Sequence, residues 1–330
     1  MPAIKRVLPI LLVVLPLFIP EVVVEFTALR VDAALVIAGM LPAIIGWTYA
    51  PRYALMSIPV AVVLNALAVL VFGHPLATTL LMVGIAVMVG LSAVWGLHAV
   101  AAFAAIQPAI VVIAGYHSVS FGGTTPGSVG QALISAGVVV IGGVWAVLIG
   151  WTLLRDESSG PPARVPSRIV VFYMGALVLM LGVASYIAST WFLKTTAGWV
   201  LLTILLVTRP TYDESRQMIR ERGVGTAVGG LIAAVVAVIV SNSTALVAIG
   251  TVSMVVAAVL QLQHARYAYF AVFVTAAIVL VDAQRSNVFE IDLQRVVYSL
   301  IGVALVVVAV AAAEMVFGRS TSSFELADGS

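Results

Sequence analysis

The feature that most constrains this chain is a succession of apolar segments, each about 17–24 residues long, that fills nearly all of it. At about 1.5 Å per residue in an α-helix, such a segment covers the roughly 30 Å hydrocarbon core of a bilayer. Of the 330 residues, 62% are hydrophobic and only 9% are charged. A soluble domain could not bury that much apolar surface, so the sequence predicts an all-α polytopic membrane protein.

Twelve such segments can be placed, with a polar break, RDESSGPPARVPSR, at 155–168 between the sixth and the seventh. The predicted spans are 7–27, 32–49, 53–73, 76–95, 98–116, 131–154, 168–189, 192–208, 224–241, 243–262, 266–283 and 295–317. The first follows Lys5 and Arg6, as the apolar region of a signal peptide does. We interpret it as a retained helix, because no small-x-small cleavage site follows it.

The distribution of basic residues supports this count. With a cytoplasmic N-terminus, the loops on the outer side contain only Arg30, Lys194, Arg285 and Arg295, and the rest of the 16 Lys and Arg residues lie inside. One missed or added helix would move every later loop to the other side. We therefore predict about twelve transmembrane helices in the cell inner (plasma) membrane, with both termini cytoplasmic.

The two halves resemble tandem copies of one six-helix unit. The segment from His98, HAVAAFAAIQPAIVVIAG, aligns with the segment from Arg266, RYAYFAVFVTAAIVLVDA, at a shift of 168 residues. Because each unit has an even number of helices, both copies would insert the same way up, and a substrate path would lie between them. The predicted division is a first repeat at 1–155, a cytoplasmic linker at 156–167, a second repeat at 168–318 and a cytoplasmic polar tail at 319–330.

A cluster of charged residues precedes the ninth predicted span, in the stretch TRPTYDESRQMIRERGVGTAVGG at 208–230. Its arginines alternate with carboxylates: Arg209, Arg216, Arg220 and Arg222 with Asp213, Glu214 and Glu221. We expect a solvated, ion-paired loop that anchors the topology, and the alternative is a basic vestibule that concentrates anions. Gly225, Thr226 and Gly229 follow with a small-residue spacing that favours close helix packing.

This stretch also carries a resemblance to a known family. Together with YAYFAVFVTAAIVLV from Tyr267 and LQRVVYSLIGVAL from Leu293, it resembles the membrane domain of the fusaric acid resistance (FUSC), or aromatic acid exporter, family. The aluminium-activated malate transporter family is a distant relative. The resemblance covers residues 168–317 well, whereas over 1–155 it survives mainly in the helix pattern. It implies efflux of aromatic carboxylic acids or conduction of organic anions, although this chain lacks the large cytoplasmic domains of many bacterial members.

Polar residues inside or beside the predicted spans are candidates for a substrate path. Gln107 and Thr275 are equivalent under the shift of 168 and lie near mid-bilayer, as does Asn65. At this depth a polar side chain either bonds across helices or lines a path, and both alternatives stay open. Basic candidates lie at the ends of the spans, where the alternative is interfacial anchoring. They are His98 and Arg266 at the inner mouth and Lys194 at the outer rim.

Glu21 and Glu25 are one helical turn apart in the first span. Two carboxylates on one face repel, so one would hold its proton more tightly, as a proton-coupled exporter requires. The alternative is a pair at the outer interface that water reaches.

No pattern in the sequence indicates catalysis or a metal site. The chain has no cysteine, four histidines and no HExxH, GxSxG or P-loop motif. We expect neither an enzyme nor a bound cofactor or metal. The net charge of +2 also gives no indication of nucleic-acid binding.

These observations predict an inner-membrane transporter that exports small organic anions, aromatic or other weak carboxylic acids, with protons as the coupling ion. The alternatives are a passive organic-anion channel and a non-transporting membrane component of an envelope complex. The expected partners are the organic anion and membrane lipids, together with a homo-oligomer or an accessory efflux subunit.

Overall fold

The computed structural model describes residues 14–27, 33–115, 128–153, 163–240, 242–262, 265–282 and 288–317. Within these ranges the regular elements are helices and no strand occurs, which confirms the all-α prediction. The predictions for Lys5 and Arg6, for most of the linker and for the tail from Arg319 lie outside the described residues.

In the described residues before the polar break, the bounded elements are seven α-helices and a short 3-10 helix. They are α2 (Ile19–Glu25), α3 (Ala33–Tyr49), α4 (Pro51–Val71), α5 (Pro75–Ser92), η2 (Ala93–Trp95), α6 (His98–Ala104), α7 (Ile106–Ala114) and α8 (Val129–Leu153). Both α4 and α5 begin at a proline, which is tolerated there because the first N–H groups of a helix have no intrahelical partner. Gly96, in the left-handed conformation at φ 72°, ends η2.

The fifth predicted span is divided at Ala105 into α6 and α7. The cause lies three residues later, at Pro108. Proline has no N–H to donate to the carbonyl of Ala104, and its ring crowds that carbonyl. The break places Gln107 in the first turn of α7.

Six helices follow the break. They are α9 (Ser167–Trp191), α10 (Gly198–Val207), α11 (Tyr212–Ile239), α12 (Ser243–Leu262), α13 (Tyr267–Asp282) and α14 (Val288–Phe317). Three of them begin several residues away from the starts predicted for the spans: α10 begins at 198 rather than 192, α11 at 212 rather than 224, and α14 at 288 rather than 295.

The early start of α11 corrects the interpretation of the charged stretch as a loop, because three of its four arginines lie on the helix. Local interactions explain why so polar a segment is helical. Asp213 and Glu214 occupy the first turn, where the positive end of the helix dipole favours negative charge. One turn further, Gln217 donates a 2.9 Å hydrogen bond to Glu221.

In the described part of the chain, five helices are long and apolar enough to cross a membrane. They are Pro51–Val71, Pro75–Trp95, Val129–Leu153, Ser167–Trp191 and Asp213–Ile239. The other apolar helices are 10–17 residues long. Among these, α10 has 10 residues, so it extends over about 15 Å, half the hydrocarbon core. A membrane protein is therefore shown, whereas twelve spans, the tandem repeat and cytoplasmic termini stay predictions.

Close helix contacts occur both before and after the polar break. α3 packs against α8 so tightly that a methyl group on Gly142 would overlap the carbonyl of Val36. α10 packs against α14, where a methyl group on Gly302 would lie 3.1 Å from the carbonyl oxygen of Val200. In both cases a glycine lets two helix backbones approach each other.

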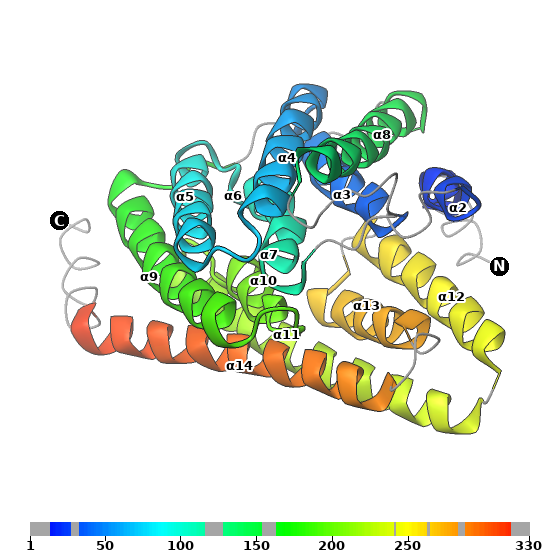
Figure 1. The fold of residues 1–330 in the computed structure, drawn as a ribbon. Coiled ribbons are helices and arrows are strands. Elements are labelled where there is room, and N and C mark those ends of the chain that lie inside the picture. Colours follow the sequence, from blue (N-terminus) through cyan, green and yellow to red (C-terminus); the bar gives the residue numbers. More distant parts are fainter. Residues whose placement is uncertain are drawn as a thin grey trace.

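One hydrophobic core joins the two parts of the chain. α5 lies alongside α9, and α7 packs on α10 (Figure 1). Ile85, Ile113, Leu181 and Ile204 share one buried cluster across these helices. α14 runs along the lower edge of the view, and α11 and α13 lie next to it (Figure 1). The helices α10, α11, α13 and α14 form the group that holds the site described below.

Candidate functional site

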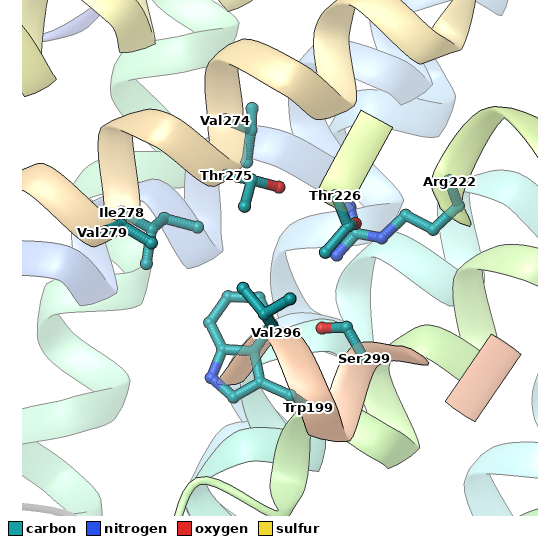
Figure 2. A pocket seen from close by; sticks show the side chains of 9 residues that line it. All are labelled: Trp199, Arg222, Thr226, Val274, Thr275, Ile278, Val279, Val296 and Ser299. Atoms are coloured by element: carbon teal, nitrogen blue, oxygen red, sulfur yellow. The ribbon is translucent and has the colours of Figure 1, made fainter. Parts of the chain in front are cut away.

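A small cavity of about 20 Å³ lies among four helices of the second half. It is lined by Trp199 from α10, Arg222 and Thr226 from α11, Val274, Thr275, Ile278 and Val279 from α13, and Val296 and Ser299 from α14 (Figure 2). A space of this size holds about one water molecule. The lining is mostly apolar, but Arg222, Thr226, Thr275 and Ser299 bring polar groups into it.

Arg222 supplies the charge in this cavity. Its side chain is only 3% exposed, although it belongs to the charged stretch that was expected to be solvated. Nη1 donates a hydrogen bond of 3.2 Å to the hydroxyl of Tyr267, and Nε has no partner among the described residues. A buried guanidinium is costly unless its charge is paired and its N–H groups are bonded. Among the described residues, the guanidinium therefore keeps an unpaired Nε–H group in the interior.

Three hydroxyl groups accompany the guanidinium. Thr226 follows Arg222 by one helical turn and so faces the same side of α11, and its Oγ1 is buried without a partner in the described structure. Thr275 and Ser299 are also buried and bring hydroxyls from α13 and α14. Figure 2 shows the Arg222 guanidinium beside Thr226, with Ile278, Val279 and Trp199 on the opposite side of the cavity. The site thus has one polar wall and one apolar wall.

The glycines around Thr226 determine how close the helices come. A methyl group on Gly225 would lie 2.5 Å from Cβ of Ala271, and one on Gly229 would overlap the carbonyl of Val272. On the other side of α11, a methyl group on Gly230 would lie 3.0 Å from Cγ2 of Val296. The motif therefore lets α13 and α14 both contact α11, and the arginine and threonine face the space that remains between them.

Of the residues predicted for a substrate path, only Thr275 lines this cavity; Thr226, predicted for helix packing, lines it as well. Gln107 is half-buried on α7 and is not part of the lining. Asn65 is buried between α4 and α8, where its amide donates to the hydroxyl of Ser135 and its carbonyl oxygen has no partner in the described part.

The predicted basic residues lie apart from the cavity lining. His98 begins α6, with its ring edge-on to Tyr173 at a centroid distance of 6.1 Å. Arg266 is exposed just before α13. Lys194 is exposed in the turn between α9 and α10, where its backbone is left-handed at φ 63° and its N–H donates to the carbonyl of Ile113 at 2.7 Å.

The predicted proton-coupling pair belongs to α2, far from the cavity in sequence. Glu21 is partly exposed and has an interaction partner. Glu25 is the last residue of α2, and its side chain lies outside what the structure describes. A proton-coupling role of the two carboxylates stays a prediction.

Sequence reasoning underestimated Arg222 and did not single out Ser299 or Trp199. The missing information was the start of α11. When residue 222 is known to be helical, Thr226 lies one turn away on the same face. The glycines at 225 and 229 then place the guanidinium beside a close helix contact. Among the residues that the structure describes, no group of His, Asp and Glu could hold a metal ion.

Comparison with protein families matches residues 183–309 to the family described as fusaric acid resistance protein-like. No curated protein and no solved structure matches the chain. The matched stretch contains every residue that lines the cavity, from Trp199 to Ser299. The family resemblance predicted from the sequence is thereby confirmed for this stretch. The chain is a membrane protein that carries a fusaric acid resistance protein-like domain at residues 183–309.

Proposed function

We propose that this protein is an inner-membrane transporter that exports small organic anions. Its substrates would be aromatic or other weak carboxylic acids, and protons would be the coupling ion. The observation that carries the proposal is the buried guanidinium of Arg222, whose Nε has no partner in the described structure and which lies in a cavity of the fusaric acid resistance protein-like domain.

Electrostatics favours a carboxylate at this position. Removing a guanidinium from water costs several kcal/mol, and an anion with good hydrogen-bond geometry offsets that cost. A carboxylate accepts paired hydrogen bonds from one edge of a guanidinium. Since Tyr267 occupies Nη1, the edge that includes Nε is the one on which a carboxylate would bind. The hydroxyls of Thr226, Thr275 and Ser299 would donate further hydrogen bonds.

The apolar wall of the cavity suits the rest of such a substrate. A weak organic acid has an apolar body next to its carboxylate, and Trp199, Ile278 and Val279 lie opposite the guanidinium. A flat ring would stack on the indole, while the aliphatic side chains would exclude water. This combination of a charged wall and an apolar wall selects weak organic acids over inorganic anions.

The size of the cavity indicates a closed site. About 20 Å³ accommodates one water molecule, whereas pockets for small organic ligands typically have about 300 Å³ or more. Substrate entry therefore requires α13 or α14 to move away from α11. Such opening and closing around a fixed arginine would serve a transporter; a passive channel would instead hold a continuous path in its open state.

A transport assay with two arginine variants tests the proposal. Purified protein in liposomes would be assayed for flux of radiolabelled benzoate. Arg222→Gln removes the buried charge, and Arg220→Gln removes an exposed charge from the same helix as a matched control. Hydrogen bonds to charged groups contribute about 1.5–3 kcal/mol, so Arg222→Gln should reduce flux at least about ten-fold. Arg220→Gln should keep the flux of the wild type.

Equal flux in both variants would place the path elsewhere. Large benzoate currents in planar bilayers without proton coupling would favour the passive channel. If the wild-type protein moved no substrate but reproducibly retained a protein partner, the non-transporting envelope component would be the better account.

A further inference from the structure

A second group of buried polar atoms lies outside the Arg222 cavity. His98 Nδ1, Tyr173 Oη and Thr208 Oγ1 are buried and have no hydrogen-bond partner among the described residues. The side chains of Tyr173 and Thr208 are 4% and 5% exposed. These residues come from α6, from α9 and from the end of α10, three helices that contact one another where the first half meets the second.

Two observations bring these residues into one neighbourhood. The rings of His98 and Tyr173 meet edge-on with centroids 6.1 Å apart. Arg209, the residue after Thr208, lies close enough to act electrostatically on both rings. Glu214, exposed on α11, is the acidic group that also acts on Tyr173.

The turn between α10 and α11, which contains Arg209, has a backbone fixed by hydrogen bonds. The hydroxyl of Ser215 accepts a 2.9 Å hydrogen bond from the N–H of Arg209 and donates one of 3.0 Å to its carbonyl. Ser215 is itself buried in the first turns of α11. The backbone of Arg209 is thereby fixed directly after Thr208.

All four residues of the group can donate hydrogen bonds. The hydroxyls of tyrosine and threonine can donate as well as accept, and Nδ1 of His98 donates in the tautomer that carries its proton on that atom. The guanidinium of Arg209 only donates, and it adds positive charge. Each buried polar group without a partner costs free energy. An anionic acceptor would satisfy several of these groups at once, whereas another donor would satisfy none of the N–H groups.

We propose that His98, Tyr173, Thr208 and Arg209 form a second anion-binding site, which takes a small carboxylate. The site lies at the seam between the halves, at the helix ends that are predicted to be cytoplasmic. In transport, a substrate would occupy this site before it reaches Arg222. This role in transport rests on the proposed function. Carboxylate binding itself does not.

Binding stoichiometry separates the two sites. Isothermal titration of the full-length purified protein with benzoate should give two sites for the wild type and one each for Arg222→Gln and Tyr173→Phe. The double variant should bind none. Tyr173→Phe keeps the ring against His98 and removes only the hydroxyl, and Tyr186→Phe, exposed on the same helix, is the matched control that should keep both sites. Melting temperatures near that of the wild type would show that the variants are folded.

Two results would overturn the inference. One is unchanged two-site binding by Tyr173→Phe, and the other is complete loss of binding in Arg222→Gln alone; in either case water would be the natural partner of the buried group. If Arg222→Gln kept both sites while Tyr173→Phe lost one, the second site would stand and the site of the proposed function would be refuted.

Discussion

A methyl group added at Gly229 tests the helix contact on which the cavity depends. The new Cβ would overlap the carbonyl of Val272 and would lie 3.0 Å from Cβ of Thr275. The carbonyl belongs to the backbone of α13, so it cannot rotate away as a side chain can. The two helices would have to separate, and Thr275 would move away from Arg222.

The expected cost follows from comparison with Gly223 on the same helix. There the nearest atom to an added Cβ is Cγ1 of Val303, at 3.9 Å, which is an ordinary contact. Both substitutions to alanine gain the same helix propensity, up to about 1 kcal/mol, so that gain cancels in the comparison. Overpacking costs about 1–3 kcal/mol. Gly229→Ala should therefore be about 1–3 kcal/mol less stable than Gly223→Ala.

Thermal unfolding of the two purified variants, followed together with benzoate flux, measures this difference. Gly223→Ala should melt at or above the temperature of the wild type and keep its flux. Gly229→Ala should melt at a lower temperature and lose flux. Equal melting temperatures and equal flux would refute the argument that direct contact of α11 and α13 shapes the site.

Three further variants address the remaining features. Thr275→Val keeps the shape of a cavity-lining side chain and removes its hydroxyl, so benzoate flux should fall several-fold at unchanged melting temperature; wild-type flux would mean that the hydroxyl does not contact the substrate. Lys194→Gly relieves a left-handed backbone conformation that costs a residue with a Cβ about 1–2 kcal/mol, and should raise the melting temperature; a lower melting temperature would contradict this, and reduced flux at higher stability would support a substrate contact of the lysine. Glu21→Gln should flatten the pH dependence of efflux if this carboxylate carries the coupling proton, and an identical pH profile would remove it from that role.

Much of the architecture could be predicted because membrane helices follow hydropathy closely. The apolar segments all contain helices. The start of α11 could not be read in this way, because a hydropathy window treats residues 212–223 as a loop. The acidic first turn and the Gln217–Glu221 hydrogen bond favour a helix there, and hydropathy does not register such interactions.

The burial of Arg222 could not be predicted from the sequence, for a different reason. It results from the packing of α10, α13 and α14 around one turn of α11, which is a tertiary property. The internal alignment did point to Thr275, which lines the cavity, but its proposed counterpart Gln107 lies on α7 outside it. The Gly–Thr motif that was taken as a marker of helix packing includes Thr226, one of the residues of the polar wall.

The most direct test of the central claim is a structure of the protein with 4-bromobenzoate, in which the anomalous signal of bromine locates the ligand. The account predicts carboxylate oxygens about 2.7–2.9 Å from the Arg222 guanidinium, with the bromophenyl ring against Trp199 and α13 displaced from α11. A transport-competent preparation in which the ligand binds elsewhere, while the Arg222 cavity stays closed, would contradict it.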